Sequence, residues 1–187
     1  MNIIKKWKIL KKQDVSPSHW LPVFKHKVEL PNNKIVDDFY IAKFPDVVMI
    51  MPMTKSGKIV FCKQYRHAID KIMLELPAGM IQKGKTHKET AIAELEEEVG
   101  IKISENKLIN IGFSSCMPHK FDYRVYSFLA MDLEFNSKQK LDENEQIEVV
   151  TLNPQIVLEK IKSEEIYSSD TVSLIFRVKL IYPEIFE

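Results

Sequence analysis

Residues 79–101 read GMIQKGKTHKETAIAELEEEVGI, a glycine-bordered loop followed by an acidic segment. The second part predicts a helix over 86–99, because Thr86 can act as the N-cap and Glu89, three residues later, completes a capping box. Gly100 suits the left-handed position that follows the last helical turn. Three of the five glycines of the chain fall in this stretch, so the backbone needs special geometry on both sides of the helix.

The predicted helix carries an unusual charge pattern. Glu94, Glu97 and Glu98 stand at i, i+3 and i+4, so their carboxylates project from one side. Like charges at this spacing destabilise a helix, and its C-terminal half disfavours anions. A solvated acidic face is one interpretation. The other is a site for a hard divalent cation such as Mg²⁺, which binds carboxylate, carbonyl and water oxygens and leaves positions open for phosphate.

Length and composition exclude several classes of protein. The chain has 187 residues, of which 45% are apolar and 28% charged, as in one ordinary folded domain, with or without an appendage. Its 27 basic and 26 acidic residues nearly cancel, which disfavours a nucleic-acid partner. Cys62 and Cys116 lack the spacing of zinc ligands or a disulfide framework. The apolar run Val47–Met53 is far too short to span a bilayer. We therefore expect a cytoplasmic protein with no membrane partner.

Periodicity predicts a mixed architecture. Helices are expected after Asn153, with Pro154 at the first position, and after Ser169-Asp170. The order of elements, with one helix among the strands and two after them, predicts an α/β or α+β sandwich. Residues 1–45 hold nine lysines and four acids, so a basic arm precedes the acidic helix. Seven β-strands are expected near 21–30, 39–43, 47–53, 58–64, 108–114, 123–132 and 146–151.

The stretch 79–101 resembles the Nudix box, G-x5-E-x7-R-E-U-x-E-E-x-G-U, where U is a bulky aliphatic residue. Seven of the nine fixed positions match, whereas Lys85 stands at the first glutamate position and Ala93 at the arginine position. In the family those two residues form an ion pair, and the loss of both leaves no unpaired partner. The resemblance implies an α/β/α sandwich with a mixed sheet. It also implies that Glu94, Glu97 and Glu98 bind Mg²⁺, with Mn²⁺ as an alternative.

Two motifs before the box are similar to the ADP-ribose pyrophosphatase branch of the family. Gln64-Tyr65-Arg66 precedes Leu76-Pro77-Ala78-Gly79, where the branch writes Q-Y-R and then E-L-P-A-G. This similarity implies that the Ala78 carbonyl is a further metal ligand, that Arg66 contacts the diphosphate, and that Met80 binds substrate. A surface strand arginine is the alternative for Arg66.

The similarity continues after the box. Pro118 lies close to the marker proline of the branch, although Met117-Pro118-His119 replaces the usual S-P-G. The tract Leu141–Glu145 resembles the flexible loop that supplies a catalytic glutamate. By position this is Glu143, acting with Glu97 at the catalytic centre, and Glu145 is the second candidate. An ordinary acidic surface loop is the alternative.

In the resembling branch, aromatic residues of the N-terminal strands stack on adenine, often across a dimer. Trp20 and Phe39 are spaced like that pair and are the candidates here, with Tyr40 in reserve; a core position is the alternative for each. We therefore expect residues 1–45 to form an N-terminal β appendage for dimerisation and base stacking, ahead of a Nudix hydrolase domain over 46–187. A homodimer is implied.

The resemblance implies Mg²⁺-dependent hydrolysis of the diphosphate bond of ADP-ribose or a related nucleoside diphosphate sugar, giving a nucleoside monophosphate and a sugar phosphate. Two alternatives stay open. The substrate is a different sugar nucleotide, such as a GDP-sugar, because the S-P-G marker is lost. Otherwise the domain is degenerate and binds a nucleotide without cleaving it, which Lys85 and Ala93 favour and the three intact glutamates disfavour.

Overall fold

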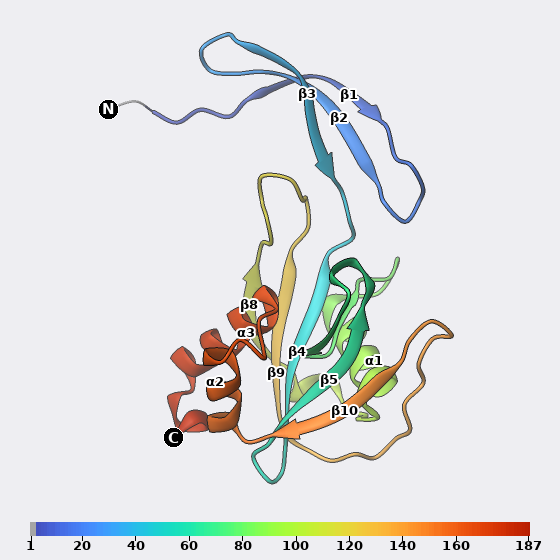
Figure 1. Cartoon of the computed structure of the whole chain (residues 1–187), viewed down its shortest axis with the longest axis vertical. Helices are drawn as coiled ribbons and strands as arrows, with labels where there is room; N and C mark the ends of the chain where they lie inside the picture. The colour runs from blue at the N-terminus through green and yellow to red at the C-terminus, as the bar shows by residue number, and fades with distance from the viewer. Residues whose placement is uncertain (1–2) are drawn as a thin grey trace. The chain divides into compact units, whose positions relative to one another are not determined.

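Ten β-strands, three α-helices and three short 3₁₀-helices make up residues 3–187, the part of the chain that the computed structural model describes (Figure 1). Residues 1 and 2 of the expected N-terminal appendage lie outside the described residues. The chain divides into two compact units. The first runs up to Pro45 and includes Ser115–Tyr123, and the second comprises Asp46–Ser114 and Arg124–Glu187.

The first unit is a three-stranded antiparallel sheet in the order β1-β2-β3. The segment Ser115–Tyr123 joins it through Ala42, whose N–H donates to the Lys120 carbonyl at 2.8 Å. The sequence did not predict β1, because KILKKQD has no apolar alternation and every residue in it is exposed. The strands are β1 (Lys8–Asp14), β2 (Val23–Glu29) and β3 (Ile35–Ala42).

The second unit contains a seven-stranded mixed sheet. Its main order is β10-β5-β4-β9-β8, with β6 paired to β5 and β7 paired to β4. The β4–β9 pair is parallel and the others are antiparallel, so the predicted mixed sheet is confirmed. The strands are β4 (Val47–Thr54), β5 (Ile59–Arg66), β6 (Lys71–Glu75), β7 (Ala78–Met80), β8 (Ile109–Ser114), β9 (Val125–Leu133) and β10 (Ile147–Leu152).

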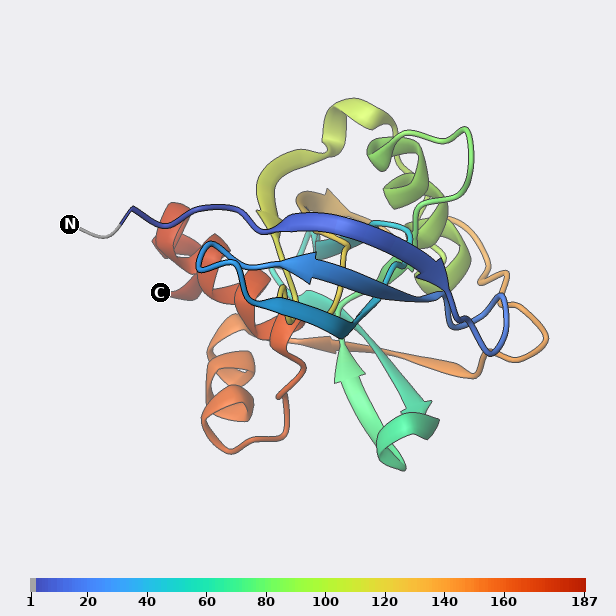
Figure 2. The same ribbon diagram turned by 90° about the horizontal axis from the view of Figure 1, so that it is seen from above.

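Helices cover both faces of this sheet. Figures 1 and 2 show α1 on one side and α2 with α3 on the other. The central strand β4 is accordingly buried along nearly its whole length. The predicted sandwich is therefore confirmed. No helix within residues 3–187 is long and apolar enough to cross a membrane. The helices are α1 (His87–Val99), α2 (Pro154–Lys162), α3 (Ser169–Ile181), η1 (His67–Ile69), η2 (Glu105–Lys107) and η3 (Pro183–Phe186).

Helix α1 has the ends that the sequence predicts. The Thr86 hydroxyl accepts the Glu89 N–H at 3.2 Å, and the Glu89 carboxylate accepts the Thr86 N–H at 2.7 Å. Gly100 follows in the left-handed conformation, with φ of 69°. Leu95 and Val99 are buried against the sheet. Local sequence alone fixes where this helix starts and stops.

Two details of the other helices differ from expectation. Asn153 precedes α2, but its side chain makes no capping hydrogen bond, and Pro154 alone marks the helix start. In α3 the periodicity predicts Val172, Ile175 and Val178 as buried positions. Ile175 and Val178 are buried, whereas Val172 is half-buried and Thr171 and Leu174 are buried as well. The Thr171 hydroxyl accepts the Leu76 N–H at 3.2 Å, which explains why a polar residue occupies that core position.

Gly100 provides a test of how the end of α1 is built. A Cβ at Gly100 would lie 2.7 Å from the Ser137 carbonyl oxygen, whereas a Cβ at Gly57 (φ of 75°) would meet nothing within 4 Å. We expect Gly57→Ala to cost about 1 kcal/mol through its left-handed backbone alone. Gly100→Ala should cost at least about 1 kcal/mol more, because it adds the collision. Urea unfolding measures both, and equal losses would contradict this account of Gly100.

Candidate active site

Glu98 is the most deeply buried carboxylate of α1, with 5% of the residue exposed. Its Oε2 accepts the Ala78 N–H at 3.0 Å, and the Cys62 thiol donates to the same oxygen at 3.7 Å. Burial raises the pKa of Glu98 to about 8, and the charges of Glu94 and Glu145 push in the same direction. Residues of β5 and β7 thus hold an acid that is reluctant to ionise.

Glu94 lies against the backbone of β7. Its carboxylate occupies the space that a Cβ on Gly79 would fill, so glycine at this position is required by the close approach of an acid to the main chain. Burial raises the pKa of Glu94 to about 7, and Glu97 is the next cause. Lys85 partly opposes the shift. Glu94 is thus a half-buried acid with a raised pKa, and its charge in turn raises the pKa of the buried Glu98.

Glu96 lies on a different side of the helix from these acids. Its carboxylate accepts hydrogen bonds from Lys140 Nζ at 2.7 Å and from the Ser137 hydroxyl at 3.1 Å. These contacts, the Lys140 hydrogen bond first, lower the pKa of Glu96. The half-buried Glu97, in contrast, contributes its charge to Glu94. Glu96 therefore lies in a different environment from Glu97 and Glu98, although the three are consecutive in the sequence.

The donor chemistry of this cluster fits a hard divalent cation. Glu94, Glu97 and Glu98 offer carboxylate oxygens and the neighbouring Ala78 adds a carbonyl, which is the oxygen-only set that Mg²⁺ prefers. Within residues 3–187, no group of three acidic, histidine or cysteine side chains is arranged closely enough to hold a metal ion. The raised pKa values of Glu94 and Glu98 nevertheless mean that ionising these acids is unfavourable, and a bound cation would offset that cost.

Arg66, at the end of β5, brings positive charge to the same region. Its Nε donates to the Glu75 carboxylate at 2.7 Å, and 46% of the Arg66 side chain is exposed. Its charge lowers the pKa of Glu98, so Arg66 lies within electrostatic reach of the acidic helix. Met80, at the end of β7, is 54% exposed. The structure thus brings Arg66, Ala78 and the helix glutamates together.

The loop from 134 to 146 is fixed to the end of α1 by an amide that the sequence did not single out. Gln139 Nε2 donates to the Glu98 carbonyl at 2.7 Å and to the Ile147 carbonyl at 3.2 Å. The Lys140 N–H donates to the Glu97 carbonyl at 2.8 Å. Gln139 thereby joins the acidic helix to the start of β10. No local motif marks this glutamine, because its partners are backbone atoms from distant segments.

The two candidate bases occupy one turn beyond this attachment. The Glu145 N–H donates to the Asp142 carbonyl at 2.9 Å, and the Glu145 carboxylate accepts the Asp142 N–H at 3.1 Å. Glu143 lies in the exposed turn between them. The charge of Glu145 raises the pKa of both Glu94 and Glu98. Glu145 therefore faces the acidic cluster electrostatically, and Glu143 is placed at the tip of the turn.

The remaining predicted residues belong to the first unit. Trp20 lies between β1 and β2 and is 78% exposed, so it is not a core residue. Phe39 packs edge-on against Trp7 at 5.5 Å between ring centroids, and Lys120 Nζ lies 4.6 Å from its ring. Pro118 is exposed in the segment Ser115–Tyr123.

Comparisons with known families and structures agree with the fold. Residues 43–168 match the NUDIX domain, and residues 7–42 match the nucleoside diphosphate sugar hydrolase N-terminal domain. A crystal structure of an ADP compounds hydrolase superposes with a TM-score of 0.86 over 98% of both chains, at 23% sequence identity. That structure shares the fold.

Relatives in sequence cover most of the chain. An ADP-ribose pyrophosphatase of Bacillus subtilis is 33% identical over 174 residues, which is 92% of each protein. A methanol dehydrogenase activator of Bacillus methanolicus is 34% identical over 146 residues, 78% of this chain and 77% of that protein. Since the NUDIX match covers most of the chain and the first of these relatives aligns along nearly its full length, this protein belongs to the Nudix family and is a Nudix hydrolase.

Proposed function

We propose that this hydrolase cleaves the diphosphate bond of ADP-ribose or a related nucleoside diphosphate sugar, releasing a nucleoside monophosphate and a sugar phosphate. The observation that carries the proposal is the half-buried Glu94 and the buried Glu98 on one helix, with Arg66 within electrostatic reach of Glu98. Two such carboxylates suit a cation and the guanidinium suits an anion, which together fit a metal–diphosphate site. The names of the Bacillus subtilis relative and of a mouse ADP-sugar pyrophosphatase, 29% identical over 119 residues, support the substrate class.

A divalent cation, Mg²⁺ with Mn²⁺ as the alternative, is the proposed cofactor. Glu94, Glu97, Glu98 and the Ala78 carbonyl would hold it. When bound, the ion neutralises charge on the diphosphate and lowers the pKa of bound water. The protein's own contribution begins with Gly79, which lets Glu94 approach the main chain.

The other residues bind and orient the substrate or move a proton. Arg66 is held at its Nε by Glu75, which leaves the outer N–H groups of its guanidinium for phosphate oxygens. A loop glutamate, Glu143 or Glu145, accepts the proton of the attacking water. Met80 and Pro118 contact the substrate, and the aromatic pair of the first unit stacks on the base.

We further propose that the protein is a cytoplasmic homodimer, with residues 1–45 as the dimerisation arm and 46–187 as the hydrolase domain. Within 3–45 and 115–123, only His26, Val28 and Ala42 are buried. A sheet with so small a core requires cover from elsewhere, and a second copy would supply it. The buried thiol of Cys62 favours the cytoplasm. Light scattering tests the dimer.

The decisive experiment is a substrate panel. ADP-ribose, other ADP-sugars, GDP-sugars and dinucleotides are incubated with Mg²⁺ or Mn²⁺, and released monophosphate is measured. Turnover of ADP-ribose supports the proposal. Preferential turnover of GDP-sugars would mean that the nucleobase of the substrate is guanine and not adenine. Thermal stabilisation by a nucleotide sugar without any turnover would mean that the protein binds the nucleotide as a sensor and does not cleave it.

Helix α1 offers a matched pair of variants. We expect Glu98→Gln to lower kcat about a hundredfold or more and to weaken metal binding, because it removes a buried carboxylate from the cluster. Glu96→Gln should do neither, since a glutamine oxygen still accepts from Lys140 and Ser137. Steady-state kinetics and metal titration measure both. Equal losses would mean that the faces of this helix are misassigned.

A second pair separates the candidate bases. The branch resemblance predicts that Glu143→Gln lowers kcat by about 10²–10⁴-fold with little change in metal affinity. The electrostatic contact of Glu145 with Glu94 and Glu98 makes Glu145→Gln the competing severe variant. Each is assayed for kcat and for Mg²⁺ affinity. The variant with the larger loss in kcat at unchanged affinity identifies the base, and a mild effect of both would remove this turn from the mechanism.

The raised pKa values of Glu94 (about 7) and Glu98 (about 8) predict a pH dependence. The folded metal-free state binds more protons than the unfolded chain between pH 4.5 and 8, so its stability falls as pH rises through 7 and 8. We expect the Tm without metal to fall from about pH 5 to about pH 8 and to level off above it, and Mg²⁺ to restore it most at the high end. Thermal unfolding measures this, and Glu94→Gln/Glu98→Gln should flatten the profile. A Tm that rises with pH in metal-free wild type would contradict it.

A further inference from the structure

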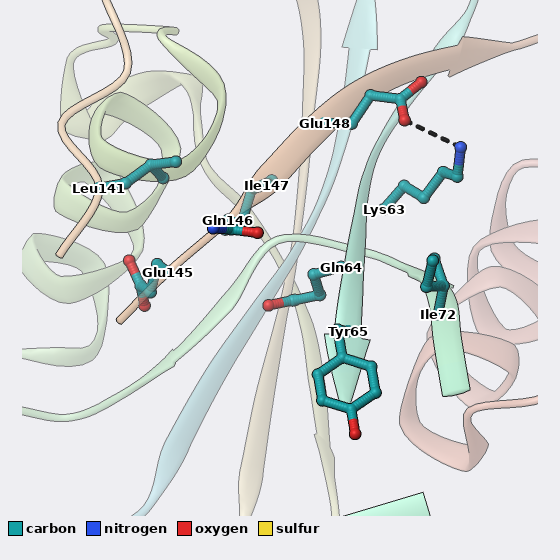
Figure 3. A pocket seen from close by; sticks show the side chains of 9 residues that line it. All are labelled: Lys63, Gln64, Tyr65, Ile72, Leu141, Glu145, Gln146, Ile147 and Glu148. Atoms are coloured by element: carbon teal, nitrogen blue, oxygen red, sulfur yellow. Dashed lines mark hydrogen bonds and ion pairs between the residues drawn. The ribbon is translucent and has the colours of Figure 1, made fainter. Parts of the chain in front are cut away.

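A cavity of about 470 Å³ opens where β10 stops pairing with β5 (Figure 3). The ladder between these strands ends at Ile147 opposite Gln64, while β5 continues to Arg66. Glu145 and Gln146, which precede β10, form one wall of the cavity, and Gln64 belongs to the facing strand. Its volume lies in the range of small-molecule sites.

Strand β5 links the cavity with the acidic site. The Cys62 thiol of β5 donates to Glu98 Oε2 at 3.7 Å, so β5 contacts the acidic helix two residues before Gln64, which lines the cavity. Gln64 is two residues from Cys62 and two from Arg66 along β5, and alternate residues of a strand share a face. Figure 3 shows the Gln64 side chain directed toward Glu145 and Gln146. A substrate with its diphosphate at Arg66 can therefore extend one end into this cavity.

The charges of the residues that line the cavity indicate which end of the substrate it accepts. Lys63 and Glu148 lie together at one side of the cavity and are paired to each other at 2.8 Å, so they cancel. Glu145 leaves the lining with net negative charge. A phosphate group is therefore disfavoured inside, and the diphosphate remains with Arg66.

The lining also disfavours a nucleobase. Tyr65 is the aromatic residue among the described residues that line the cavity, and Figure 3 shows its ring directed away from Glu145. Its hydroxyl donates to Asp70 at 3.0 Å. A nucleobase that stacks between two aromatic rings would lack the second ring here.

We propose that this cavity is the subsite for the terminal sugar of the nucleoside diphosphate sugar, with Gln64 and Gln146 recognising its hydroxyl groups. The proposal rests on the proposed function. Side-chain amides both donate and accept, and the carboxylate of Glu145 accepts, so together they match neighbouring hydroxyls. Leu141 and Ile147 supply aliphatic surface for the C–H face of the ring. Gln64 and Gln146 are thus specificity-determining residues for the sugar.

The test compares two substrates that differ only at this end: ADP-ribose, and ADP carrying a methyl ester on its β-phosphate. The variants are Gln64→Ala, Gln146→Ala and the double variant. The control is Gln155→Ala, a glutamine of α2 whose Nε2 donates to the Glu187 carbonyl at 2.9 Å, outside the cavity. Glu145 is left intact, since it is a candidate base.

We expect each single variant to lower kcat/KM for ADP-ribose about five- to tenfold, mainly through KM, and to change the methyl ester less than twofold. The control should change neither. Equal losses on both substrates, or no loss with the double variant, would overturn the subsite. If Gln64→Ala fails to fold, Gln146→Ala alone decides, because its exposed loop position tolerates truncation. Wild type that cleaves neither substrate would overturn the proposed function instead.

Discussion

The close approach of two carboxylates of one helix, the half-buried Glu94 and the buried Glu98, to the sheet constrains the residues around them. Glu94 and Glu98 can reach the sheet only because Gly79 has no side chain and because the Ala78 N–H points at an acid. Both requirements depend on the register of β7, which pairs Gly79 with Val48 of β4. A shift of one residue would turn every side chain of β7 to the opposite face and remove the seat of the acids. The chemistry of the site is thus tied to one strand pairing.

The absence of the usual brace before α1 has a local compensation. Lys85 and Ala93 replace the glutamate and arginine that pair in the family, so the loop preceding the helix is held by other means. The Ile81 N–H donates to the Asp46 carbonyl at 2.8 Å, which fixes the start of the loop. The capping box at Thr86 fixes its end. Lys85 meanwhile lowers the pKa of Glu94, so the lysine at this position adds positive charge close to the acidic cluster.

What the sequence predicts well is what depends on neighbours in sequence. The ends of α1 follow from Thr86 and Gly100, and the grouping of its glutamates follows from helical spacing. The short strands β6 and β7 were both missed, because each has at most five residues and only Leu76 and Pro77 separate them. Gln139 could not be predicted, because its partners belong to Glu98 and Ile147, far along the chain. For the same reason, spacing alone could not decide how Glu143 and Glu145 lie toward the helix.

The two hydrogen bonds of Gln139 also limit how far the proposed bases, Glu143 and Glu145, can move. Because this amide fastens the loop both to α1 and to β10, only the six residues from 141 to 146 remain between two fixed points. The entropic cost of ordering this short loop is therefore met when the protein folds and does not recur at each turnover. In the proposed mechanism, the carboxylate of Glu143 or Glu145 is therefore at high effective concentration beside the substrate, and each added residue would lower that concentration. The length of this loop would then set the reaction rate without changing any proposed contact with the substrate.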